Sequence, residues 1–171
     1  TIPNGIGVVV DGTGVGAGNV IGMIGDGSAG DVARANVISG NRSHGVQFSG
    51  SSSGNRIAGN KIGTNTAATA DFGNAGIGVL IQATPNGQVV GGTAAGLGNV
   101  IAFNGSNGVG LLNNVTNSPI LGNSIFSNGG LGIDLRLAGF VAGVNLNDLG
   151  DGDSGANNQQ NFPLLTQIIA S

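Results

Sequence analysis

The sequence lacks several residue types, and each absence excludes a class of chemistry or partner. It contains no Cys, which excludes disulfides and thiolate chemistry. Trp, Tyr and Glu are also absent, so the acidic residues are eight Asp. Five basic residues and a net charge of −3 leave no basic patch that could neutralise a run of phosphates, and we expect no nucleic-acid partner. No apolar run approaches the roughly 20 residues of a membrane span, so we expect no such span.

Glycine and asparagine, by contrast, are abundant, with 36 Gly and 22 Asn among 171 residues. Both are poor helix formers, which excludes an all-helical fold. Four Pro without a three-residue period exclude collagen, and a composition of 39% hydrophobic and 8% charged residues does not fit a disordered chain. We therefore expect one folded domain that contains many tight turns.

An internal repeat covers about 130 residues. Residues 36–62 match residues 99–125 at a constant offset of 63, and residues 5–10 match residues 76–81 at an offset of 71. Short apolar runs bounded by Gly and Asn predict brief strands separated by turns. Strands this short are expected to pair with their equivalents in the next repeat, as in a parallel β-solenoid. The pattern predicts an all-β fold of about five rungs, which begin near Gly7, Gly45, Gly78, Gly108 and Gly132.

Asparagine recurs at the predicted strand ends, where the chain must turn a corner. We expect these Asn to adopt the left-handed backbone conformation and to stack into hydrogen-bonded amide ladders. The positions are Asn41, Asn60, Asn104 and Asn123. Inward Val, Ile, Leu and Phe side chains are expected to stack as columns between the corners.

The repeated units Asn-Val-Ile-x-x-Asn, Gly-Val-x-Phe/Leu and Ile-x-Gly-Asn-x-Ile resemble the right-handed parallel β-helix repeats of the pectin-lyase-like superfamily. They resemble more closely the Gly/Asn-rich repeats of secreted bacterial surface proteins, in which a segment similar to residues 147–164 often follows. The resemblance covers roughly residues 4–165. It implies a right-handed parallel β-helix at a secreted or cell-surface location, with polysaccharide as a possible partner. Because this superfamily includes lyases, hydrolases, epimerases and adhesins, the resemblance specifies the fold more narrowly than the activity.

The predicted domain has two parts. Residues 1–140 form the rungs, and residues 141–171 form an acidic Asp/Asn loop and an apolar C-terminal cap over the last rung. Right-handedness also follows from the general rule for parallel crossovers. The first rung begins near the N-terminus without a visible cap, which predicts an excised domain, an adjoining domain or end-to-end association of two chains.

Side chains on the outer face of the first predicted strand of each rung are the candidates for ligand contact. Alternation along these strands predicts two outward columns. The first contains Val9, Gln47, Leu80, Gly110 and Asp134, and the second contains Asp11, Ser49, Gln82, Leu112 and Arg136. The polar members Gln47, Ser49, Gln82, Asp134 and Arg136 are the predicted ligand-binding residues. Asp134 and Arg136 are close enough for an ion pair, which we expect to be exposed and weak.

The same columns argue against the usual glycosidase chemistry. A carboxyl pair that cleaves glycosides is separated by about 5 to 9.5 Å. Asp11 and Asp134 lie on the first and fifth rungs, which places them about 19 Å apart at the spacing of β-strands. They are therefore not expected to form a catalytic pair.

His44, Arg42 and Asp71 are the remaining catalytic candidates. His44 lies in the turn before the second rung, and Asp71 lies in an insertion at the equivalent turn before the third. Stacked turns would make them neighbours, and His is the usual proton-transfer group near neutral pH. The alternative is a solvated turn histidine without a catalytic partner.

Asp148, Asp151 and Asp153 form an acidic, glycine-containing loop in the tail. Calcium prefers several oxygen ligands from such a loop, so calcium is a possible cofactor. The alternative is a solvated loop in which Asp side chains make local turn bonds.

Three functions remain open from the sequence. The leading one is a non-catalytic extracellular module that acts as a surface scaffold or contacts carbohydrate. The alternatives are a small polysaccharide lyase or glycoside hydrolase, and a self-associating structural spacer.

Overall fold

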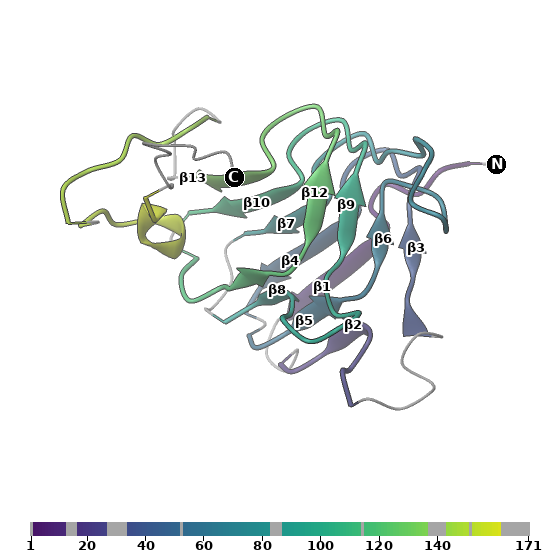
Figure 1. The fold of residues 1–171 in the computed structure, drawn as a ribbon, viewed down its shortest axis with the longest axis horizontal. Coiled ribbons are helices and arrows are strands. Elements are labelled where there is room, and N and C mark those ends of the chain that lie inside the picture. Colours follow the sequence, from purple (N-terminus) through teal and green to yellow (C-terminus); the bar gives the residue numbers. More distant parts are fainter. Residues whose placement is uncertain are drawn as a thin grey trace, which may run out of the picture.

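The computed structural model describes residues 2–12, 17–26, 34–51, 53–82, 87–113, 115–136, 143–150 and 152–161. In these residues the chain winds repeatedly through three parallel sheets, here named A, B and C (Figure 1). Sheet A contains β1 (Val8–Gly12), β4 (Val46–Gly50), β7 (Val79–Ile81), β10 (Val109–Leu112) and β13 (Ile133–Arg136). Sheet B contains β2 (Val20–Gly22), β5 (Arg56–Ala58), β8 (Val89–Gly91) and β11 (Ile120–Leu121). Sheet C contains β3 (Val37–Ile38), β6 (Lys61–Ile62), β9 (Val100–Ala102) and β12 (Ser124–Phe126).

Every strand pairs in parallel with the equivalent strand of the neighbouring turn, which confirms the predicted parallel β-solenoid. Each strand has two to five residues, so it contributes only a few hydrogen bonds to any one neighbour. Stability therefore depends on repetition, because each turn is held mainly by the turns on either side of it.

Aliphatic side chains fill the interior in columns. In β4, Val46 and Phe48 are buried, whereas the alternate residues Gln47 and Ser49 are only partly covered. The interior column through Phe48 continues to Ile81 and Leu111 on the next two strands of sheet A. Sheets B and C contribute equivalent columns, with Ile57, Val90, Ile62 and Ile101 fully buried. Burial of these side chains is the main driving force for folding.

Carboxamides stack at all three corners, which confirms the expected amide ladders and adds a third. The C–A ladder joins Asn41, Asn74, Asn104 and Asn128, with Nδ2–Oδ1 distances of 2.6, 2.8 and 2.9 Å. The B–C ladder joins Asn36, Asn60, Asn99 and Asn123, with distances of 2.9, 3.2 and 2.8 Å. The A–B ladder joins Asn19, Asn55 and Gln88. In every link the amide N–H of one turn donates to the amide oxygen of the following turn, so each ladder has a direction.

The predicted backbone conformation of the corner Asn residues is wrong. The left-handed φ belongs to the residue before the ladder amide, as at Gly40, Gly59, Phe103 and Gly122, which have φ of 69°, 71°, 60° and 65°. The amide itself stays outside the left-handed region because its side chain must point across the corner to the next turn. Phe103 adopts this conformation without the freedom of glycine, which costs on the order of 1 kcal/mol.

The glycine that precedes each sheet A strand is required by close packing. A Cβ on Gly78 would lie 2.7 Å from Gly108 O, 2.7 Å from Ile101 Cγ2 and 2.9 Å from Asn104 Nδ2. A Cβ on Gly7, Gly45 or Gly108 would lie similarly close to the equivalent atoms around that glycine. Gly132 in the last turn is different, because the nearest atom to its Cβ position is Ile125 Cγ2 at 3.7 Å.

Part of the C-terminal tail packs against the end of the solenoid. The 3-10 helix η2 (Ala156–Gln159) places Ala156 in the hydrophobic core. Asn157 Oδ1 accepts a hydrogen bond from Ser118 N at 3.0 Å, and Asn157 Nδ2 donates to Ser118 O at 2.8 Å. Since Ser118 continues the column of Gln88, Asn157 supplies the amide that a further turn would place at the A–B corner. The apolar segment predicted to complete the cap, residues 162–171, lies outside the described residues.

Candidate functional site

The outer face of sheet A carries the predicted ligand-contact columns in the predicted register. Val9 pairs with Gln47, Gln47 with Leu80, Leu80 with Gly110, and Gly110 with Asp134. Accessibility changes along this column, because Val9 is 49% exposed whereas Leu80 is 3% and Asp134 is 1% exposed. A Cβ on Gly110 would contact Ile77 and Leu80, so these two side chains fill the space above that glycine. This first outward column is therefore accessible to solvent at β1 and β4 and covered from β7 to β13.

Gln47, Ser49 and Gln82 are partly exposed members of the predicted site, and together they are here named the polar patch. Gln47 and Ser49 lie two residues apart on β4, and both are partly exposed. Gln82 follows β7 directly, and its backbone N–H donates to Phe48 O at 3.0 Å, which places it beside β4. The patch thus presents neutral amide and hydroxyl groups from adjacent strands.

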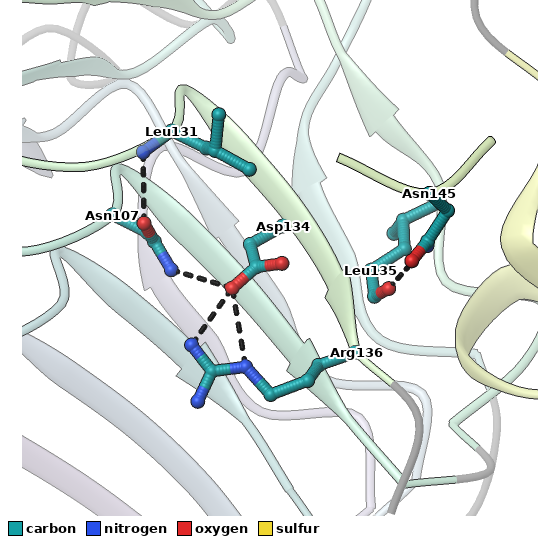
Figure 2. A network of polar contacts seen from close by, with 6 residues as sticks. All are labelled: Asn107, Leu131, Asp134, Leu135, Arg136 and Asn145. Carbon is teal, nitrogen blue, oxygen red and sulfur yellow. Dashed lines mark hydrogen bonds and ion pairs between the residues drawn. The ribbon is translucent and has the colours of Figure 1, made fainter. Parts of the chain in front are cut away.

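Asp134 belongs to a separate, buried cluster at the other edge of sheet A (Figure 2). Its Oδ2 accepts hydrogen bonds from Asn107 Nδ2 at 2.7 Å, Arg136 Nη2 at 2.8 Å and Arg136 Nε at 3.2 Å. Its Oδ1 is buried and has no hydrogen-bond partner among the residues that the structure describes. The ion pair expected from the sequence is present, but Asp134 is buried rather than exposed, and the Arg136 side chain is 26% exposed.

This geometry limits the chemistry available to Asp134. Asp134 is only 1% exposed, and its Oδ2 accepts from three N–H groups, so the carboxyl group is enclosed by its own neighbours. Asp11 lies on β1 at the opposite edge of sheet A, four strand spacings away, or about 19 Å. The two carboxylates of this face are therefore too far apart for glycoside cleavage by an acid pair.

His44 makes a contact between turns instead of a contact with Asp71 or Arg42. Its Nδ1 accepts a hydrogen bond from Ile77 N at 3.0 Å, and burial lowers its pKa. Asp71 Oδ1 accepts from Gly73 N at 2.9 Å within its own loop, and Arg42 N donates to Asn4 O at 2.9 Å. Among the residues that the structure describes, no hydrogen bond or ion pair joins the three side chains, and their catalytic role stays a prediction.

Asn107 is a site residue that sequence reasoning missed. Its Oδ1 accepts from Leu131 N at 2.8 Å while its Nδ2 holds Asp134. Asn107 and His44 both stand immediately before a sheet A glycine, and each accepts from the backbone N–H of the equivalent residue one turn later. Aligning the residues before these glycines places Asn107 in the same column as His44, and this is the signal that could have identified it.

The predicted calcium loop is described only in part. Asp148 Oδ2 accepts from Gly152 N at 3.2 Å, and the Asp148 backbone bonds in both directions to the Asn161 carboxamide. Asp153 is partly exposed, and Asp151 lies outside the described residues. Over the described ranges, no group of three or more His, Cys, Asp or Glu side chains is arranged to hold a metal ion. Calcium binding stays a prediction.

Comparison with known proteins finds no matching family model, curated protein or solved structure. The assignment of the fold therefore depends on the strand pairing itself. In the part of the chain that is described, no helix has the length and apolar character to cross a membrane.

Proposed function

We propose that this protein is a non-catalytic β-solenoid module that holds the polar patch of sheet A against a polysaccharide. The observation that carries the proposal is the position of Gln47, Ser49 and Gln82, which are partly exposed on β4 and directly after the adjacent strand β7. Carboxamides and hydroxyls both donate and accept hydrogen bonds, as sugar hydroxyls do. A polymer that lies along the solenoid axis meets a new strand about every 4.8 Å, so it can contact successive turns in a regular way.

Rigidity supports a scaffold role. The corner amides link each turn to the next, and hydrogen bonds between buried groups become stronger in a low dielectric. The patch is thereby held on a backbone that needs no ligand to order it, which lowers the entropic cost of binding.

The absence of catalysis is part of the proposal. Asp11 and Asp134 are separated by three intervening strands, and Asp134 is only 1% exposed, so a substrate on this face has little access to it. Membership of the pectin-lyase-like superfamily and a secreted or cell-surface location also belong to the proposal, and the repeat units at residues 36–62 and 99–125 support them.

A polysaccharide panel tests the proposal directly. We expect the protein to bind at least one polysaccharide, and the variant Gln47→Ala/Ser49→Ala/Gln82→Ala to lose that binding while its thermal unfolding stays cooperative. Ser124→Ala is the matched control, because Ser124 is exposed on β12 of sheet C. Binding that survives the triple substitution, or a panel without any binder, would refute the role of the patch. Release of reducing or unsaturated ends during the assay would instead support the hydrolase or lyase alternative.

A further inference from the structure

The N-terminal end of the solenoid is open. β1, β2 and β3 are the edge strands of sheets A, B and C, so within the described part of the chain each has a neighbour on one side only (Figure 1). Val20 and Val37 are each 44% exposed at this end. A cavity of about 480 Å³ opens between these strands, and its lining includes Asn36 and Asn41. An open edge of this kind is a template for pairing with further backbone.

The direction of the ladders determines which chemical groups this end can accept. In the B–C ladder, each Asn donates both its backbone N–H and its Nδ2–H to the Oδ1 of the next turn. Asn36 begins this ladder, so its N–H groups are used as donors while its Oδ1 receives no donor from any described residue. The first amide of the ladder is therefore a hydrogen-bond acceptor that faces outward along the axis.

The C–A ladder begins in the same way. Asn41 donates to Asn74, and its Oδ1 likewise receives no donor from the described residues. Asn4 lies over this corner, since its carbonyl accepts Arg42 N at 2.9 Å, but its carboxamide makes no bond to Asn41. Without a preceding strand of sheet C to hold Asn4, the link that completes every later turn is missing here.

We propose that the N-terminal end is a docking surface for one further parallel β-solenoid turn that carries Asn or Gln at its corners. Such a turn would present backbone N–H and carboxamide N–H donors to Asn36 Oδ1, hold Asn4 in place over Asn41, and cover Val20 and Val37. Its strands would extend sheets B and C beyond β2 and β3. This inference is independent of the polysaccharide contact, which lies on the outer face of sheet A.

A second copy of this chain fits the surface less well in either orientation. Two N-terminal ends placed together would bring the corner oxygens of Asn36 and Asn41 against oxygens of the same kind, so the amide ladders could not continue from one copy to the other. At the C-terminal end of a second copy, Asn157 already occupies the A–B corner, and sheet A has one strand more than sheets B and C in the described part of the chain. That end is therefore stepped and does not match the first turn.

A fused turn tests the surface. In the test protein, a copy of residues 75–103 is placed directly before Asn4. The copied Asn99 then lies over Asn36. Asn4 takes the position that Asn104 has in a native turn. We expect amide hydrogen exchange in β2 and β3 to slow on the order of tenfold and the melting temperature to rise. The matched control carries Asn99→Asp in the copy alone, which removes the side-chain donor to Asn36 and keeps every backbone group.

Comparing the two fused proteins distinguishes the possible outcomes. Protection of β2 and β3 by the fused turn that is reduced in the Asp control supports the proposal. Unchanged exchange in β2 and β3, or equal protection by both fused turns, overturns it. Sedimentation of the unfused protein is expected to give a monomer, and a dimer that the fused turn abolishes would show that the occupant is a second copy.

Discussion

Asn74→Asp offers the sharpest test of the amide ladders, because it changes one atom at the centre of the C–A corner. Asn74 is 1% exposed. Its Oδ1 accepts from Asn41 Nδ2 at 2.6 Å, and its Nδ2 donates to Asn104 Oδ1 at 2.8 Å and to Ile38 O at 3.1 Å. Aspartate keeps the acceptor oxygen and loses both donated bonds.

The loss of stability depends on whether each acceptor that loses a hydrogen bond keeps another donor. Asn104 Oδ1 has no other donor within the described ranges, so it becomes a buried unsatisfied acceptor at a cost of about 1–3 kcal/mol. Ile38 O keeps the hydrogen bond from Gly63 N at 2.9 Å. Losing the bond from the residue 74 side chain to this carbonyl therefore costs about 0.5–1.5 kcal/mol. We expect Asn74→Asp to lower the free energy of unfolding by about 2–4 kcal/mol, and by more while the buried carboxylate is charged.

The pH dependence has a definite sign. Burial opposite two acceptor oxygens raises the pKa of the new carboxyl above its unfolded value of about 3.9. The deficit relative to the parent protein is therefore largest above the folded pKa and shrinks as the pH falls through it, because the protonated group can donate to Asn104 again.

Urea unfolding at neutral and mildly acidic pH measures both effects. Asn65→Asp is the matched control, because Asn65 Oδ1 accepts from Thr69 N at 2.9 Å, a bond that aspartate retains, and Nδ2 donates only to the exposed Thr69 Oγ1. We expect this control to lose less than about 0.5 kcal/mol. A loss at Asn74 no larger than at Asn65, or a deficit that grows as the pH falls, would refute the reasoning.

Two further predictions concern single positions. Gly78→Ala should lose about 1–3 kcal/mol through overpacking, whereas Gly132→Ala in the same column should be neutral or slightly stabilising; equal effects in thermal melts would contradict the packing argument. His44 accepts a hydrogen bond as the neutral imidazole and burial lowers its pKa, so its contribution to stability is complete above the unfolded pKa of about 6.5 and is lost as the pH falls below it. His44→Asn retains an acceptor without titrating, and it should flatten this part of the stability profile between pH 8 and 5; an unchanged slope would exclude His44 as its source.

The repeat allowed much of the fold to be predicted. The constant offset between residues 36–62 and 99–125 predicts that each turn stacks on the next, and the outward column from Val9 to Asp134 appears in the expected register. The reason is local, because similar turns bury similar side chains only when equivalent positions lie above one another. The amides at Asn41 and Asn60 were expected to stack for the same reason, although their backbone conformation was assigned to the wrong residue.

The candidate site was less predictable, because burial on an outer face depends on neighbours that do not repeat. Alternation places Leu80 and Asp134 outside the core, yet both are almost completely covered. The turn residue Ile77 packs over Gly110, and Asn107 and Arg136 enclose one oxygen of Asp134. A pattern along one strand contains no information on which side chain of the adjacent turn fills the space above it.

By itself, the sequence determined the solenoid, the stacking of its turns and the identity of the interior columns, since these depend on short-range periodicity that every turn shares. Only the tertiary structure decided the direction of the ladders, the capping of one corner by Asn157 and the open acceptors of Asn36 and Asn41. The capped corner and the open acceptors arise where the repeat stops. At such an end a hydrogen-bond donor or acceptor has no equivalent in the next turn, so its partner depends on which other part of a protein lies there.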